Sequence, residues 1–305
     1  MPSWQSTLLT SAFRARRFLD RSTGDLQIEK ERAAMEKLAA LFRPSIYAKH
    51  TTVSADGVSA EWITPPGAME SRVILYLHGG SYAVGSIDSH RVLVGNIAHA
   101  AHARALAIDY RLAPEHPHPA ALRDTLTTYR WLLSQAPPPD HVIVAGDSAG
   151  GGLALATAVA LREANEPLPT ALVCLSPWTD LTLSGERYTD NAASDLILTA
   201  DRLATFARWY LGEADPSSPL ASPLYANLSG LPPILIQVGS DEMLLSDATR
   251  VAERAKAAGV NVVLETWEGM QHEWQFASRL LPEAREAIIH IGAFIQKACT
   301  SRAAR

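Results

Sequence analysis

The 305 residues can bury one large core, and neither the 47% hydrophobic share nor the 19% charged share departs from an ordinary globular protein. The formal net charge of -5 and the absence of any Lys/Arg-rich run argue against nucleic acid as a partner, and the two distant cysteines, Cys174 and Cys299, form neither a disulfide framework nor a zinc pattern. No run approaches the roughly 20 apolar residues that span a bilayer, and the N-terminus lacks the charge order of a secretory signal, so we expect a cytoplasmic protein without membrane insertion.

Residues 1–45 carry apolar side chains at helical spacings of three and four, and Pro44 ends the pattern. Short strands and turns follow from about residue 50. Strands buried on both faces then alternate with helices, which predicts an α/β fold with a mostly parallel sheet and helices on both faces. The predicted strands are 72–78, 104–111, 141–147, 170–177, 232–240 and 261–269, and the predicted helices are 90–103, 119–135, 149–164, 246–259 and 282–299.

Residues 178–230 interrupt this alternation. They hold a stretch of helical spacing at 194–212, followed by a segment rich in Pro and Ser. We therefore expect a single domain over 1–305, in which about 1–45 and 180–225 form a helical lid over the carboxyl edge of the sheet.

The sequence Gly-Asp-Ser-Ala-Gly at 146–150 lies between a predicted strand and a predicted helix. A Gly-x-Ser-x-Gly pattern in this context is typical of a nucleophilic serine on a sharp turn, where flanking side chains would clash. The helix behind it offers free N–H groups and a positive dipole end to a developing anion. An ordinary N-cap serine in a glycine-rich turn is the structural alternative.

A second pattern, His78-Gly79-Gly80-Ser81, follows the strand at 72–78. Backbone N–H groups in such a loop can stabilise an oxyanion, and glycine lets a substrate approach closely. The alternative is an ordinary turn, and we expect His78 to hold the loop rather than to transfer a proton.

Together these patterns resemble the hormone-sensitive-lipase-like carboxylesterases of the α/β-hydrolase fold, from about residue 70 to the end. The resemblance implies an oxyanion hole at Gly79, Gly80, Ser81 and Ala149, with the N–H groups of the last three as donors. Ser81 stands where the family usually has a third glycine. The matching stretches are HGGSY (78–82), DYRLAPEHPHPAAL (109–122), GDSAGGGLA (146–154), LSPWTDLT (175–182), VGSDEMLLSD (238–247) and EGMQHEWQ (268–275).

In this fold the base and its orienting acid follow the nucleophile in the order Ser, acid, His. His272 comes after the last predicted strand and before the final helix, as that order requires. For the acid, the resemblance aligns the chain to place Glu242 at the family's position, about 30 residues before the histidine. The neighbouring Asp241 remains the alternative.

The resemblance implies a serine carboxylesterase that hydrolyses short-chain esters through an acyl-enzyme on Ser148. It implies no metal and no organic cofactor, a small-molecule ester as the partner, and a possible homodimer. A lactonase or a small-molecule deacetylase with the same residues stays open, because the lid sets substrate choice. A non-catalytic ligand receptor on a hydrolase fold is a third hypothesis, which the presence of His272 disfavours.

Overall fold

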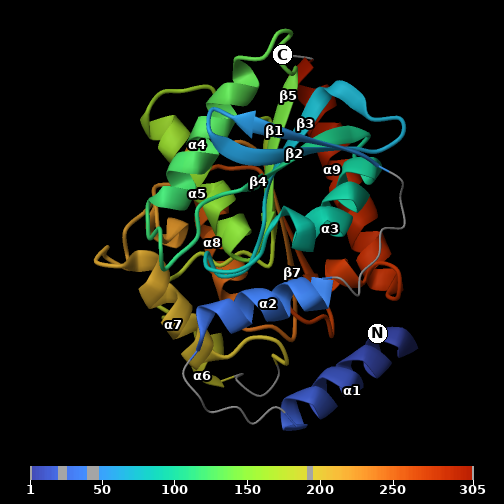
Figure 1. Cartoon of the computed structure of the whole chain (residues 1–305), viewed down its shortest axis with the longest axis vertical. Helices are drawn as coiled ribbons and strands as arrows, with labels where there is room; N and C mark the ends of the chain where they lie inside the picture. Colours follow the sequence, from blue (N-terminus) through green and yellow to red (C-terminus); the bar gives the residue numbers. More distant parts are fainter. Residues whose placement is uncertain (1, 20–25, 40–47, 191–194, 304–305) are drawn as a thin grey trace.

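The computed structural model describes residues 2–19, 26–39, 48–190 and 195–303 (Figure 1). The strands within these ranges form one eight-stranded sheet in the order β1-β2-β4-β3-β5-β6-β7-β8. They are β1 (Lys49–Ala55), β2 (Val58–Thr64), β3 (Met69–Leu77), β4 (Ala103–Asp109), β5 (His141–Asp147), β6 (Ala171–Leu175), β7 (Ile234–Gly239) and β8 (Val262–Trp267).

The six strands from β3 to β8 are parallel to one another, which confirms the predicted mostly parallel sheet. The hairpin of β1 and β2 adds two antiparallel strands at one edge. Its turn is Asp56-Gly57, and both residues have positive φ, as a two-residue hairpin turn requires.

Helices cover both faces of the sheet (Figure 1). Alternate residues of β3 enter different cores: Leu75 packs in the core that includes α4, α5 and α8, and Ile74 packs in the core that includes α3 and α9. The helices are α1 (Trp4–Leu19), α2 (Ile28–Ala39), α3 (Ile87–Ala100), α4 (Ala120–Leu133), α5 (Ala149–Glu163), α6 (Arg187–Asp190), α7 (Ala200–Leu211), α8 (Leu245–Ala257) and α9 (Pro282–Ala303), with short 3-10 turns η1 (Pro223–Tyr225) and η2 (Trp274–Ala277).

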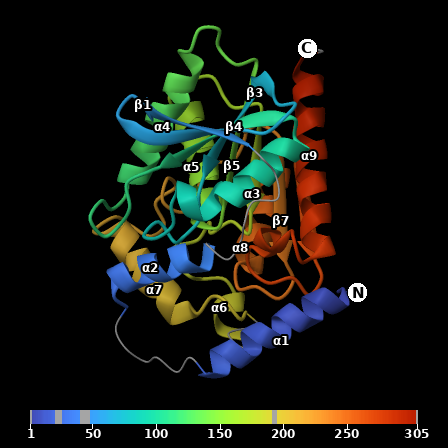
Figure 2. The same cartoon turned by 45° about the vertical axis from the view of Figure 1, so that its right-hand side comes forward.

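The N-terminal helices and the segment after β6 gather at the same end of the molecule, where α1, α2, α6 and α7 lie in Figures 1 and 2. Arg32 of α2 donates through Nε to the carbonyl oxygen of Ala83 (2.9 Å), in the loop that follows β3. Glu31 of the same helix pairs with Arg202 of α7. These contacts place α2 and α7 over the carboxyl end of β3. The predicted helix end at Pro44 lies outside the described residues.

Among the described residues, no helix combines the length and the apolar character needed to cross a membrane. The 22-residue α9, for example, packs one face on the sheet and carries charged residues on the other.

Candidate active site

Ser148 lies on a sharp turn between β5 and α5, with φ 51° and ψ -118°. A side-chain-bearing residue with positive φ is strained, and such strain concentrates at functional turns. The turn is also crowded, since a Cβ at Gly150 would overlap the carbonyl oxygen of Leu77 on β3. The Ser148 side chain makes no capping hydrogen bond to α5, so the alternative of an ordinary N-cap serine is wrong.

The hydroxyl of Ser148 instead faces an imidazole from near the end of the chain. Its Oγ lies 3.1 Å from Nε2 of His272, and Nδ1 of the same ring lies 2.6 Å from Oε2 of Glu242. The three residues are 4%, 4% and 0% exposed. The turns after β5, β7 and β8 thus bring together three residues that the sequence separates by up to 124 positions.

Glu242 is held on both carboxylate oxygens. Besides the imidazole, it accepts hydrogen bonds from the hydroxyl of Ser176 (2.8 Å) and from the backbone N–H of Gly239. Asp241 is partly exposed and accepts from the hydroxyl of Ser240 (2.8 Å). The structure therefore places Glu242, and not Asp241, against the ring.

The charge on His272 depends on its two carboxyl neighbours. Burial lowers the pKa of His272, but the negative charges of Glu273 and Glu242 outweigh burial and raise it to about 9. The contribution of Glu273 exists only while that carboxyl is ionised. An ionised Glu273 therefore favours the protonated imidazole.

The predicted oxyanion loop lies after β3. The backbone nitrogen of Gly79 lies 3.2 Å from Nε2 of His90, so Gly79 packs against that ring and shapes the loop. Gly80 (φ 108°) and Ser81 (φ 53°) turn the backbone through the left-handed region. Within the described ranges, no hydrogen bond occupies the N–H groups of Gly80, Ser81 or Ala149.

Aromatic stacking supports this loop. The pKa of His78 falls to about 3 on burial, so the ring is neutral; its Nδ1 donates to the carbonyl oxygen of Gly79 (2.7 Å), and it stacks on Tyr110 at 4.2 Å. Tyr82 is buried and stacks on Tyr210 of α7 at 3.7 Å. His78 thus holds the loop, as the sequence predicts.

Sequence reasoning missed two residues near Ser148, namely His90 and Glu273, which both contact Asp147. Asp147 is fully buried, accepts from the hydroxyl of Tyr76 (2.6 Å), and lies 3.1 Å from Nε2 of His90. Burial would raise the pKa of Asp147, but the facing His90 and the hydrogen bonds from His90, Glu273 and Tyr76 hold it below its usual range. The available signal was Asp147 itself, since a charge at the end of a buried strand requires a partner. Nothing in the sequence around His90 or Glu273 singles either out.

A third missed residue, Asp195, connects the segment after β6 to the site. Its Oδ2 accepts from the N–H of Met243 (2.8 Å), next to Glu242, and its Oδ1 accepts from the N–H groups of Ile197 (2.8 Å) and Leu198 (2.7 Å). Because Asp195 is fully buried, these bonds fix residues 195–198 against the loop that carries the acid.

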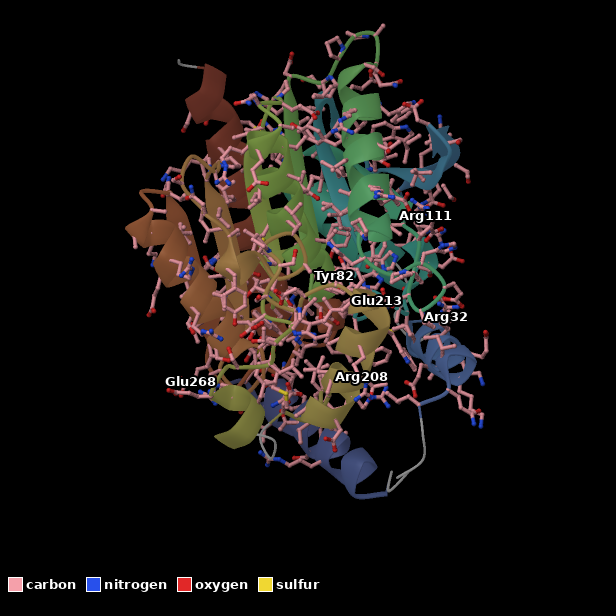
Figure 3. All side chains as sticks on the ribbon, turned by 90° about the vertical axis from the view of Figure 1, so that its left-hand side faces the viewer. Arg32, Tyr82, Arg111, Arg208, Glu213 and Glu268 are labelled. Carbon is pink, nitrogen blue, oxygen red and sulfur yellow. The ribbon has the colours of Figure 1, made fainter. Side chains whose placement is uncertain are left out.

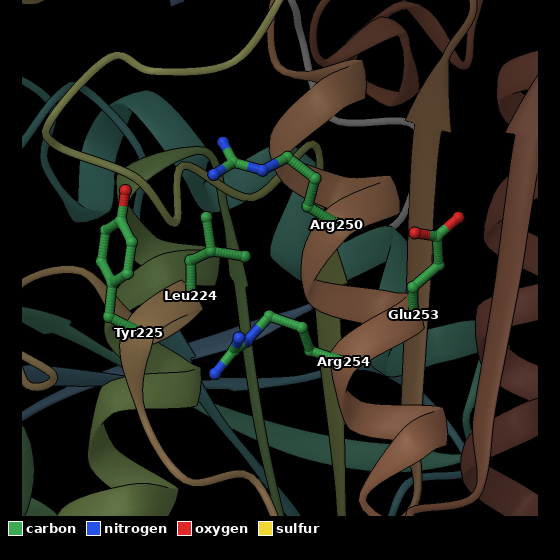
Figure 4. A pocket seen from close by; sticks show the side chains of 5 residues that line it. All are labelled: Leu224, Tyr225, Arg250, Glu253 and Arg254. Carbon is green, nitrogen blue, oxygen red and sulfur yellow. The ribbon is translucent and has the colours of Figure 1, made fainter.

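A recess of about 260 Å³ lies elsewhere, between η1 and α8 (Figure 4). Its lining contains no member of the array of Ser148, His272 and Glu242. The lining residues are Leu224, Tyr225, Arg250, Glu253 and Arg254.

Comparison with known proteins agrees with this architecture. A sequence profile of the alpha/beta hydrolase fold matches residues 74–276. An acetyl-hydrolase of Streptomyces hygroscopicus is 44% identical over 272 residues, which cover 89% of this chain and 91% of that protein. An esterase of Acinetobacter venetianus is 36% identical over 264 residues, covering 86% and 87%. The crystal structure of an esterase from the bacterial hormone-sensitive lipase family matches with a TM-score of 0.92 and 45% identity, covering 98% of this chain and 99% of that one. The chain belongs to the bacterial hormone-sensitive lipase family of α/β hydrolases.

Proposed function

We propose that the protein is a serine carboxylesterase in which Ser148 is the nucleophile, His272 the general base and acid, and Glu242 the acid that orients the imidazole. The observation that carries the proposal is the hydrogen-bonded array of these three residues on a strained turn. The relatives in Streptomyces hygroscopicus and Acinetobacter venetianus, named as an acetyl-hydrolase and an esterase, support the same reaction class.

In the acylation step, Oγ of Ser148 attacks the ester carbonyl carbon while Nε2 of His272 takes the hydroxyl proton. Nε2 then returns that proton to the leaving alcohol as the carbon–oxygen bond breaks. Glu242 keeps the other proton on Nδ1 and stabilises the charged ring. Water next attacks the acyl-enzyme by the same proton route, which releases the carboxylic acid and restores Ser148.

The carbonyl oxygen gains negative charge in both steps. We assign its donors to the N–H groups of Gly80, Ser81 and Ala149, in the pocket to which Gly79 gives its shape. Each such donor contributes about 3 kcal/mol of transition-state stabilisation in related chemistry. Ser81 can replace glycine here because the donor is the backbone N–H, although its side chain is bulkier.

The test is hydrolysis of p-nitrophenyl butyrate by Ser148→Ala, with Ser229→Ala on the exposed surface as the matched control. We expect S148A to lose at least about a thousandfold in kcat, because the residual rate comes only from the oxyanion donors and binding. S229A keeps the wild-type rate, and circular dichroism verifies that both variants fold. Wild-type turnover by S148A would refute the assignment, and so would a wild type that binds esters without cleaving them, as a receptor does.

The name of the Streptomyces hygroscopicus relative favours an acetyl group as one acyl group that the site takes. We therefore propose small-molecule esters with short acyl chains as substrates, and an acetylated amide or a lactone as the alternative. Parallel rates on a p-nitrophenyl ester, a lactone and an aryl amide separate the three.

Three further features belong to this proposal. We propose that α2 and the segment around α7 act as the lid, that the enzyme works in the cytoplasm, and that it forms a homodimer. The contacts of Arg32 and Glu31 support the first, and the family resemblance supports the third. Light scattering during size-exclusion chromatography measures the oligomeric state.

A further inference from the structure

Glu273 directly follows the catalytic histidine and adopts the left-handed backbone conformation, with φ 57°. This turn directs its carboxyl back toward the site. Oε1 lies 3.6 Å from Nε2 of His272, the nitrogen that faces Ser148. The same oxygen is shielded from water and has no hydrogen-bond donor. A carboxyl thus lies beside the atom that must exchange protons during the reaction.

The same carboxyl lies beside Asp147 and under the oxyanion loop. A Cβ at Gly79 would overlap Oδ2 of Asp147 and lie 2.7 Å from Oε1 of Glu273, so only glycine leaves room for both acids. Both oxygens therefore lie around the same point under Gly79, where each carboxyl acts on the pKa of the other. Two carboxyls placed in this way share one proton, because both cannot be ionised there.

The surroundings decide which acid holds that proton. Asp147 has the hydroxyl of Tyr76 at 2.6 Å and the ring of His90 at 3.1 Å, and both stabilise its ionised form. Oε1 of Glu273 has no such donor. The proton therefore belongs to Glu273.

The electrostatics agree with this placement. Burial raises the pKa of Glu273 to about 8, against the lowering effect of His272, and the charge of Asp147 adds to the rise. Several titratable groups interact with Glu273, from its own loop and from elements packed against it. They are His272 in the same loop, Asp147 at the end of β5, His90 on α3, Tyr76 on β3 and Tyr110 after β4.

We propose that Glu273 is a positioning residue that works as a neutral acid: protonated, it bonds Asp147 and leaves Nε2 of His272 to Ser148. This inference rests on the proposed function of that array. An ionised Glu273 would stabilise a proton on Nε2 and repel the negative charge that forms on the substrate oxygen. The active form of the enzyme is therefore the one with neutral Glu273, and activity declines as this carboxyl ionises on the alkaline side.

The experiment compares kcat/KM from about pH 5 to about pH 10 in the wild type, Glu273→Gln and Asp147→Asn. The exposed Glu268 (Figure 3) supplies the matched control, Glu268→Gln. We expect an alkaline limb near pH 8 in the wild type and in E268Q. E273Q cannot ionise, so its alkaline limb moves up by at least about one unit while its acid limb stays in place. D147N removes the neighbouring charge, so its alkaline limb moves down.

Two results would overturn the inference. Profiles of E273Q and D147N with the wild-type alkaline limb would show that Glu273 does not titrate in the working enzyme. A lower acid limb in E273Q, with an unchanged alkaline limb, would show that Glu273 is ionised when the enzyme is active. Stoichiometric labelling of wild-type Ser148 by an organophosphate separates these failures from failure of the proposed function. A labelled wild type with either of these profiles refutes the inference alone, whereas an unlabelled wild type refutes the proposed function on which the inference rests. If E273Q does not fold, the downward shift in D147N alone decides.

Discussion

Two adjacent carboxyl groups, Glu242 and Asp241, lie in opposite surroundings. Glu242 is buried and bound to the imidazole at 2.6 Å, whereas Asp241 is partly exposed and bound to Ser240. We expect Glu242→Gln to lower kcat by about a thousandfold or more, because the amide favours the wrong tautomer of the ring. Asp241→Asn is the matched control and should change kcat by less than about threefold, as for a surface substitution. Steady-state kinetics measures kcat of the two variants. A large loss in Asp241→Asn with little change in Glu242→Gln would show that Asp241 is the acid that orients the imidazole.

At the scale of single residues, the sequence selects Ser148 and His272, and the structure brings these two side chains together. The context of a strand, a glycine-flanked serine and a helix identifies Ser148, and position after the last strand identifies His272. It left the acid open between two neighbours, because the direction of each side chain depends on the turn after β7. His90 and Glu273 could not be predicted, since they act through contacts with Asp147 that no local pattern encodes.

Among the elements, the segment after β6 is tied to the site by one buried carboxylate. Asp195 accepts from Met243 on one oxygen and from Ile197 and Leu198 on the other. Asp195→Asn keeps one accepting oxygen and sets an amide N–H₂ against a backbone N–H. We expect it to cost about 1–3 kcal/mol of stability, the price of one unsatisfied buried group.

Because the lost contact adjoins Glu242, the same variant should also lower kcat, by about tenfold for a misplaced acid. Urea unfolding and steady-state kinetics measure both effects, and Asp201→Asn on the exposed side of α7 is the control. Loss of stability with unchanged kcat would mean that Asp195 holds the segment but does not position the acid.

The alternation of apolar strands and amphipathic helices predicted the elements from β3 to α9, since each buries its own apolar pattern. The antiparallel pairing of β1 and β2 at the sheet edge was not predicted, because β1 is mostly exposed and carries no continuous apolar face. The contacts of α2 also escape sequence reasoning. They join Arg32 to Ala83 and to Glu115, which lie far along the chain.

At the scale of the whole molecule, the parallel sheet brings the residues of the candidate site together. Turns at the carboxyl ends of β5, β7 and β8 meet at one edge, so residues from distant parts of the chain form one site. The helices α2 and α7 lie at the same end (Figure 2). The sequence predicts this edge from the alternation of buried strands and helices, but the shape of the substrate pocket depends on how the lid packs.

The central claim is that Ser148 forms a covalent acyl intermediate with the help of His272. Its most direct test is the intact mass of the protein after reaction with a diethyl organophosphate, followed by peptide mapping. We predict one diethylphosphoryl group per chain, attached to Ser148, with labelling slowed by at least about a thousandfold in His272→Ala. An adduct on another residue, or an active enzyme that takes up no label, would contradict the account.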